Sequence, residues 1–281
     1  MLPEEAIMDV NFIVTVYVTI DEICQHVLAK PKYRPKMTPA EILLVAIVAA
    51  RYFNNNLERA LLVLGQTGYI PENRRLSISR YNRQLHLHLD TLEVCVNTLL
   101  ELSRHGEAFI LDSMPVPVCK RKRARRCRKV HGRMFCGYCA AKDEKFFGWR
   151  LHLICNPDGL PVNFVILPAA LHDLTPIYEL SYELPNGSTL YGDKAYNDAN
   201  AEDLLRLAFV RLIPVRRRNM KNQHDWADEY DLRQYRKGVE TVNSQLESMG
   251  INRLRARTNN GFFIKVQASL LALWHTQAIA N

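Results

Sequence analysis

Residues 108–115 read Ala-Phe-Ile-Leu-Asp-Ser-Met-Pro, and this stretch decides the fold that we expect for the chain. Four apolar residues in a row, with a phenylalanine and an isoleucine among them, are typical of a short strand covered on both faces. We expect the strand to span residues 108–111 and Pro115 to stop a regular ladder soon after Asp112. A carboxylate at the end of a buried strand is costly unless a cation meets it. We therefore expect a divalent metal at Asp112, shared with two later acids.

The first of these acids follows a similar stretch. Residues 189–196 read Thr-Leu-Tyr-Gly-Asp-Lys-Ala-Tyr, which predicts a strand over 189–192 that ends in Gly192 and then Asp193. Groups at the carboxyl ends of neighbouring parallel strands converge on one crevice. Asp112 and Asp193 are thus predicted to face each other. Taken alone, Asp193 is better explained as a cap for the helix that follows.

The second acid lies on a predicted helix over residues 231–249. An apolar face recurs at helical spacing, at Leu232, Tyr235, Val239, Val242 and Leu246. Glu240 lies at the border of that face, where either Arg236 pairs with it from four residues earlier or it points at the same metal. Three carboxylates suffice to hold two Mg²⁺ ions, or Mn²⁺ in their place, for an in-line displacement at phosphorus.

Two domains are expected from the change in pattern near residue 106. Helices are predicted over residues 7–30, 39–53, 57–64 and 77–103, so residues 1–105 form an all-helical region. Residues 106–281 alternate strands and helices, with strands at 108–111, 148–155, 161–167, 189–192 and 210–215. A hairpin turn is expected at 156–159. This order predicts an α/β domain with a mixed sheet flanked by helices, and a basic insertion at 119–146.

The overall composition indicates a polyanionic partner. The 281 residues carry a formal net charge of +8, with a pI of about 9.1. Seven cysteines in a chain of this length favour a reduced, cytoplasmic protein over a disulfide scaffold. Glu4, Glu5 and Asp9 are unlike a signal peptide, and the longest uncharged apolar run, residues 42–50, is too short to span a membrane.

The positive charge is clustered. A Ser-capped, basic helix start at residues 77–85 follows two short helices, as in a helix-turn-helix module that would offer Arg80 and Arg83 to DNA; a solvated helix face explains it equally well. Three further runs lie beside the three acids and are interpreted as phosphate contacts: Lys120, Arg121, Lys122, Arg123, Arg125 and Arg126; Arg216, Arg217 and Arg218; and Arg253, Arg255 and Arg257. Repulsion should keep the first run extended without a polyanion.

A zinc site in the insertion is a weaker hypothesis. Cys136 and Cys139 form a C-x-x-C pair, and Cys119 and Cys127 lie upstream of it. Four thiolates can close a structural zinc site. Because the upstream spacing is irregular, free cysteines in a reducing compartment are the explanation that we favour.

Three blocks resemble a known family. Residues 110–119 (ILDSMPVPVC), 191–196 (YGDKAY) and 235–247 (YRKGVETVNSQLE) are similar to the DDE-class transposases of bacterial insertion sequences, in particular the group numbered nine-eight-two, over residues 30–281. The resemblance implies a ribonuclease-H-like core with the triad Asp112, Asp193 and Glu240. It also implies Mg²⁺-dependent cutting of terminal inverted repeats and joining of the 3′-hydroxyl to target double-stranded DNA, by a homodimer at the nucleoid of the bacterial cytoplasm.

The resemblance also bears on residues around the triad. Related transposases carry a Tyr-Arg-Glu-Lys signature; here Arg236 matches its arginine as a DNA contact, but Arg233 and Glu247 replace its tyrosine and lysine. His172 with Asp173 resembles a His-Asp pair near the active site, and Lys194 and Asn243 are further contact candidates. Two alternatives stay open: a non-catalytic DNA-binding regulator, and a metal-dependent nuclease without strand joining.

Overall fold

Two units make up the computed structural model, which describes residues 8–281 except 31, 173, 178, 179, 181, 182 and 221. The helical unit comprises the chain up to Leu99 and again from Leu246 onward, and the sheet unit comprises residues 100–245. The first boundary lies close to the one expected at residue 105. Residues 246–281, which we expected in the second domain, instead pack with the N-terminal helices.

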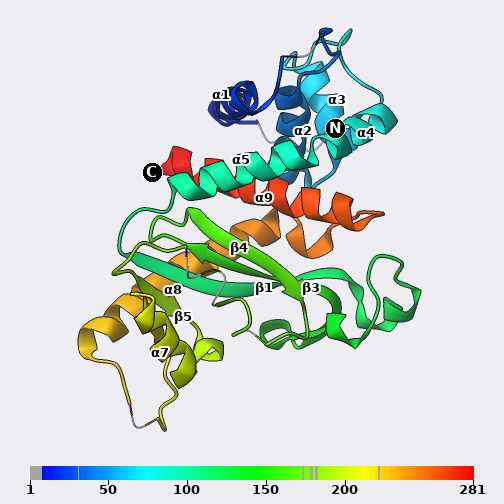
Figure 1. The fold of residues 1–281 in the computed structure, drawn as a ribbon. Coiled ribbons are helices and arrows are strands. Elements are labelled where there is room, and N and C mark those ends of the chain that lie inside the picture. Colours follow the sequence, from blue (N-terminus) through cyan, green and yellow to red (C-terminus); the bar gives the residue numbers. More distant parts are fainter. Residues whose placement is uncertain (1–7, 31, 173, 178–179, 181–182, 221) are drawn as a thin grey trace, which may run out of the picture. The chain divides into compact units, whose positions relative to one another are not determined.

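The helical unit is built around one apolar helix, α2 (Pro39–Phe53), which is labelled in Figure 1. Every residue of α2 from Ala40 to Ala50 is buried. A helix that is apolar all round needs cover on all sides, and α2 contacts several of its neighbours. The other elements are α1 (Val10–Val27), α3 (Leu57–Gln66), α4 (Ile78–Leu87), α5 (Leu89–Leu102), η5 (Ile251–Arg253) and α9 (Asn259–Ala280). Among the described residues, none of the helices combines the length and the apolar character needed to cross a membrane.

The start of α2 is fixed by reciprocal capping, at the residue that the sequence predicts. The Glu41 backbone N–H donates to Oγ1 of Thr38 over 3.2 Å, and the Thr38 backbone N–H donates to Oε2 of Glu41 over 2.7 Å. Arg74 also pairs with the buried Glu41 carboxylate at 2.7 Å. The cap, Pro39 at the first helical position and this ion pair together set where α2 begins.

The single helix predicted over residues 77–103 is wrong, because the structure divides it into α4 and α5. His88 ends α4, and its N–H donates to the carbonyls of Gln84 and Leu85. No glycine or proline marks this break. The two helices bury separate apolar faces, and Leu87 at the junction is left exposed.

The sheet unit contains a mixed sheet, as expected. Its strand order is β2-β3-β1-β5-β6, with β4 also paired to β3 (Figure 1). The strand β3 is antiparallel to both β1 and β4, whereas β5 and β6 run parallel to β1. The elements are β1 (Ala108–Lys120), η1 (Arg121–Arg126), η2 (Arg133–Phe135), β2 (Cys136–Cys139), η3 (Ala140–Lys142), β3 (Glu144–Cys155), β4 (Pro161–Pro168), β5 (Thr189–Gly192), η4 (Lys194–Tyr196), α7 (Ala199–Leu207), β6 (Arg211–Pro214) and α8 (Trp226–Ser248).

The first strand is much longer than predicted. We expected β1 to end at Leu111 and Pro115 to stop the ladder, but β1 continues to Lys120 and Pro115 lies opposite Arg150 of β3. The parallel pairing of β1 with β5 ends at Leu111. Beyond Leu111, β1 pairs with only one described strand, β3, and its other edge forms no ladder with β5. Pro115, which lacks an N–H, is tolerated on that other edge.

The other predicted strands are present, although β3 begins at Glu144, four residues earlier than expected, and β2 was not predicted. The turn at residues 156–159 joins β3 to β4, with Gly159 in the left-handed region at φ 77°. Asp198 caps α7 by accepting from the Ala201 N–H. Thr175 and Pro176 form a helix start in the sequence, but the helix expected from them includes residues 178, 179, 181 and 182, which lie outside the described part of the chain.

Replacing Thr38 with alanine should lower the free energy of unfolding of the helical unit by about 1 kcal/mol, because an orphan N–H loses its side-chain acceptor. Urea unfolding followed by circular dichroism measures the loss. Thr38→Ser keeps the hydroxyl and serves as the control. An equal loss in both variants would show that the cap hydrogen bond is not the cause.

Candidate active site

The register of the parallel strands brings the first two acids together. Leu111 of β1 lies opposite Gly192 of β5, so the next residues, Asp112 and Asp193, leave the two strands side by side. Electrostatic interaction between the two carboxylates contributes to the raised pKa of Asp112. The predicted convergence of these two acids at the carboxyl ends of neighbouring strands is therefore present in the structure.

Asp112 is held at both carboxylate oxygens. Its Oδ1 accepts from the Ser113 backbone N–H over 2.8 Å, and its Oδ2 accepts from Nδ2 of Asn243 over 2.6 Å. Burial, reinforced by the nearby Asp193 charge, raises the pKa of Asp112 to about 6 despite these hydrogen bonds and the nearby Arg236. A carboxyl with so high a pKa is short of positive charge, which a bound cation would supply.

The third acid reaches the same place from α8. A pocket of about 100 Å³ is lined by Asp112, Asp193 and Glu240, together with Ile110, Leu111, Gly192, Arg236 and Val239. The Glu240 side chain is 69% exposed, so it stands at the mouth of this pocket rather than in its floor. Gly192 ends β5 beside the acids, where a side chain would crowd Tyr196.

A guanidinium lies among the carboxylates. Nη2 of Arg236 is 3.6 Å from Oδ1 of Asp193 and 3.9 Å from Oε1 of Glu240. Glu240 thus pairs loosely with Arg236 and also lines the pocket of the two aspartates. The described residues contain no group of three or more Asp, Glu, His or Cys side chains close enough to hold a metal ion.

The chemical identity of the acids nevertheless fits a hard divalent cation. Mg²⁺ takes oxygen ligands, commonly one or two protein carboxylates, and keeps the rest of its shell for water and phosphate. Three carboxylates, from β1, from the end of β5 and from α8, line the pocket. The guanidinium of Arg236 already supplies one positive charge there. Asp112, Asp193 and Glu240 are therefore the residues that would hold a metal.

The other active-site candidates have different surroundings. Asn243 contacts Asp112 directly, as described above. Lys194 follows Asp193 on η4 and is exposed. His172 is exposed and its Nδ1 accepts from the Leu174 N–H at 3.3 Å. Neither Lys194 nor His172 is among the described residues that line the pocket, and Asp173 lies outside the described residues.

The basic insertion is folded rather than extended. The predicted repulsion does not keep residues 121–126 extended, because they form the 3₁₀ helix η1. A small cluster with buried Cys127, Val130, Phe135 and Phe147 lies beneath it, and Ala124 of η1 packs onto this cluster. The cationic side chains of the run remain exposed, at Lys120, Arg121, Lys122, Arg123, Arg125 and Arg126. We call this surface the basic arm.

The cysteines of the insertion serve packing. Cys119, Cys127 and Cys136 belong to the same cluster, and all four candidates, Cys139 included, are free thiols. The described part of the chain gathers no three metal ligands there.

The two later basic runs differ from each other. Arg216 forms an ion pair within the sheet unit. Its guanidinium donates to both carboxylate oxygens of Glu202, at 2.7 and 2.6 Å, and its side chain is only 13% exposed. Arg217 and Arg218 are exposed, and so are Arg253, Arg255 and Arg257, but these last three belong to the helical unit.

The raised pKa of Asp112 gives a pH dependence with a definite sign. Because the folded state holds this proton more tightly than the unfolded state, folding stability should fall as pH rises from about 4 to about 6. About two pKa units correspond to about 3 kcal/mol. Without divalent metal, Asp112→Asn should therefore be more stable than the wild type at neutral pH, and the difference should vanish below about pH 4.

Urea unfolding in EDTA across this pH range measures the effect, and Asp158→Asn, at the exposed β3–β4 turn, is the control. A pH-independent difference between Asp112→Asn and wild type would contradict the assignment.

Known proteins resemble this chain in sequence and in fold. Residues 103–274, more than half of the chain, match the family model of the transposase DDE domain. A piggyBac transposase, solved by cryo-EM as a synaptic complex with hairpin DNA, is similar in fold: the TM-score is 0.50 at 12% identity, covering 97% of this chain and 74% of that one. A search of curated proteins finds no match. The chain belongs to the family of DDE transposases.

Proposed function

We propose that this transposase cuts the ends of an insertion sequence and joins the freed 3′-hydroxyl to target DNA, with Asp112, Asp193 and Glu240 as its catalytic carboxylates. The observation that carries the proposal is the pocket that these three side chains share with Arg236. The acids come from two neighbouring strand ends and one helix, 81 and 47 residues apart along the chain (193 − 112 and 240 − 193). A purely structural role would not require three acids to converge around one arginine.

The chain's own residues orient the site. Asn243 and the Ser113 N–H each hold one oxygen of Asp112, which fixes the direction of its remaining lone pairs. Two bound Mg²⁺ ions, with Mn²⁺ as a substitute, would supply activation of the attacking oxygen and charge stabilisation of the leaving oxygen. Under this proposal the protein needs no covalent nucleophile, and its task is to position carboxylates and the DNA backbone.

Arg236 has two successive roles in this proposal. Before DNA binds, its guanidinium offsets the charges of Asp193 and Glu240. If the three acids held a metal, the Arg236 side chain, which is 40% exposed, would be free to contact a DNA phosphate. The distances of 3.6 and 3.9 Å are those of loose ion pairs, which yield readily to a stronger cation.

Finer features of the proposal rest on topology and on the resemblance of sequence motifs. The order β4-β3-β1-β5-β6, with three antiparallel strands followed by two parallel ones, supports a ribonuclease-H-like core. The motifs support the insertion-sequence group numbered nine-eight-two, and with it a homodimer that pairs two element ends at the nucleoid. The α3–α4 region remains our candidate for a helix-turn-helix-like module.

The basic arm is proposed to clamp the DNA backbone. Six cations lie on one 3₁₀ helix and the residue before it, and a packed cluster anchors that helix to β1 and β3. Such a surface binds phosphates without reading sequence. Its anchoring means that the cations are already arranged before DNA arrives.

Replacing Asp112, Asp193 or Glu240 with its amide should abolish cutting of a duplex that carries the inverted repeats flanking the coding region, while DNA binding is retained. Asn243→Ala should cost about 10- to 100-fold in activity, because it orients a ligand rather than serving as one. Asp203→Asn, an exposed acid on α7, is the matched control.

Each alternative has its own outcome in this assay. Wild type that binds but never cuts would favour a regulator, and cutting without joining would favour a nuclease. Full activity of any one of the three amide variants would contradict the triad.

Neutralising the basic arm by changing all six cations to glutamine should weaken DNA binding and flatten its dependence on salt. The slope of log K against log salt should fall by about 0.9 for each phosphate that the arm no longer neutralises. Fluorescence anisotropy with a labelled duplex measures the slope. An unchanged slope would refute the clamp.

A further inference from the structure

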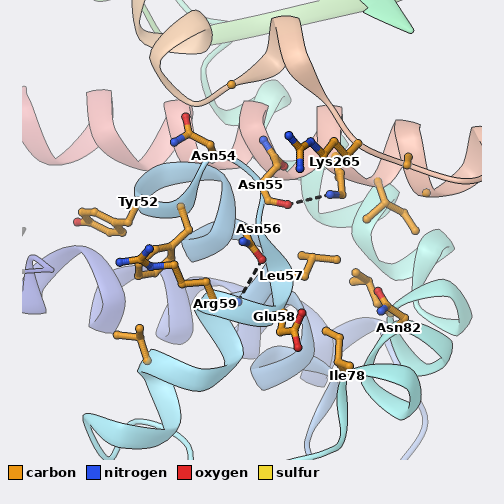
Figure 2. A pocket seen from close by; sticks show the side chains of 18 of the residues that line it. Tyr52, Asn54, Asn55, Asn56, Leu57, Glu58, Arg59, Ile78, Asn82 and Lys265 are labelled. Atoms are coloured by element: carbon orange, nitrogen blue, oxygen red, sulfur yellow. Dashed lines mark hydrogen bonds between the residues drawn. The ribbon is translucent and has the colours of Figure 1, made fainter. Parts of the chain in front are cut away.

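A large groove lies entirely within the helical unit and shares no lining residue with the carboxylate pocket of the sheet unit. Its volume is about 1670 Å³, and its walls come from the turn between α2 and α3, from α4, from the segment after η5 and from the start of α9. Figure 2 shows side chains of the α2–α3 turn, α3, α4 and α9 around this space, among them Arg59 of α3, Asn82 of α4 and Lys265 of α9. Small-molecule sites usually measure about 300–1,000 Å³, so the groove is large for such a ligand.

The charged groups that line the groove are almost all cationic. They are Arg59, Arg253, Arg255, Arg257 and Lys265, with His86 beside them and Glu58 as the single acid among the described lining residues. Lys265 is anchored by donating to the carbonyl of Asn55 over 2.8 Å, which fixes one positive charge at the groove wall (Figure 2). This excess of positive charge is complementary to a polyanion.

Three of these cations are displayed by one short segment. Arg253, Arg255 and Arg257 keep solvent access, whereas Leu254 between the first two is buried. Arg253 ends the 3₁₀ helix η5, and Arg255 and Arg257 follow it in the irregular segment before α9. No ion pair joins these three arginines to any described residue. Their guanidinium groups are thus available for phosphates.

The opposite wall offers groups suited to base edges. Ser79, Asn82 and His86 of α4 line the groove at helical spacing, so they share one face of that helix. Asparagine can pair bidentately with adenine, and serine can donate or accept at any base. Arg80 and Arg83, which we expected to face DNA, are not among the residues that line the groove.

We propose that this groove is a second DNA-binding site, in which Arg253, Arg255 and Arg257 hold the phosphates of one strand of a duplex while the Ser79–Asn82–His86 face of α4 contacts its bases. The two ends of the chain thus build one DNA surface, separate from the site of chemistry. This assignment replaces the Arg80–Arg83 face of α4 as the face turned toward DNA.

The inference rests on the chain acting on DNA, but not on its metal chemistry. Binding is therefore measured in EDTA, where no cutting takes place. Loss of cutting in the triad variants with intact groove binding would leave this inference standing. A groove variant that cuts normally yet binds duplex as well as the wild type would overturn the inference alone.

The experiment compares double variants of the full chain with equal charge changes, using a labelled mixed-sequence duplex in a salt titration. Arg253→Gln with Arg255→Gln should reduce the slope of log K against log salt by about 1.8, from about 0.9 for each contact. Lys32→Gln with Arg34→Gln removes two exposed charges of the same unit outside the groove and should leave the slope unchanged. Arg253→Lys with Arg255→Lys keeps the charges and should keep the slope.

Three results would overturn the proposal: a groove variant with the wild-type slope, a Lys32–Arg34 variant that loses as much as the groove variant, or an Arg80→Gln with Arg83→Gln variant that loses more. Circular dichroism of each variant checks that the helical unit is folded. A lost helical signal in the glutamine variant with a normal signal and normal slope in the lysine variant would also count against it, because the arginines would then serve folding.

Discussion

The carboxylate of Asp112 stands where the parallel pairing of two strands ends, partly buried and next to a second acid. Burying an ionised group is costly unless it meets an opposite charge or good hydrogen-bond donors. The chain provides two donors and a nearby arginine, yet the pKa of Asp112 still rises to about 6. The Asp112 carboxylate therefore lacks a sufficient positive charge nearby. A cation that binds more strongly than a guanidinium would stabilise it in this pocket.

Under the proposed function, the positive charge that gathers elsewhere on the molecule would serve the same site. A site that acts on phosphodiesters must bring a polyanion toward three acids, and the acids repel it. The basic arm of the sheet unit and the groove of the helical unit each present cations on packed supports. Electrostatic attraction at these surfaces would offset the repulsion, and metal binding would remove what is left.

Much of the site could be predicted because its signals are local. The strand before Asp193 ends in Gly192, and the period of α8 places Glu240 at the border of its apolar face. The parallel register then follows from general rules of sheet construction. The long continuation of β1 past Pro115 could not be predicted, since it depends on which strand edge carries the ladder. The folding of η1 depends likewise on a cluster assembled from distant residues.

The packing of the C-terminal residues from Leu246 onward against the N-terminal helices could not be predicted from the sequence either. Nδ2 of Asn55 donates to the carbonyl of Met249 and to Oγ of Ser269, across 194 and 214 residues. Such contacts have no period or spacing that a sequence would reveal. They place residues 251–258 beside the N-terminal helices, and so they turn a basic run that seemed to belong to the third acid into one wall of a separate groove.

The position of bound metal tests the central claim most directly. Anomalous diffraction from crystals of the protein soaked in Mn²⁺ would locate it without relying on activity. The account predicts anomalous density among the carboxylates of Asp112, Asp193 and Glu240, with the Arg236 guanidinium moved out of that space. Clear density at other sites only, with Arg236 still between Asp193 and Glu240, would contradict it.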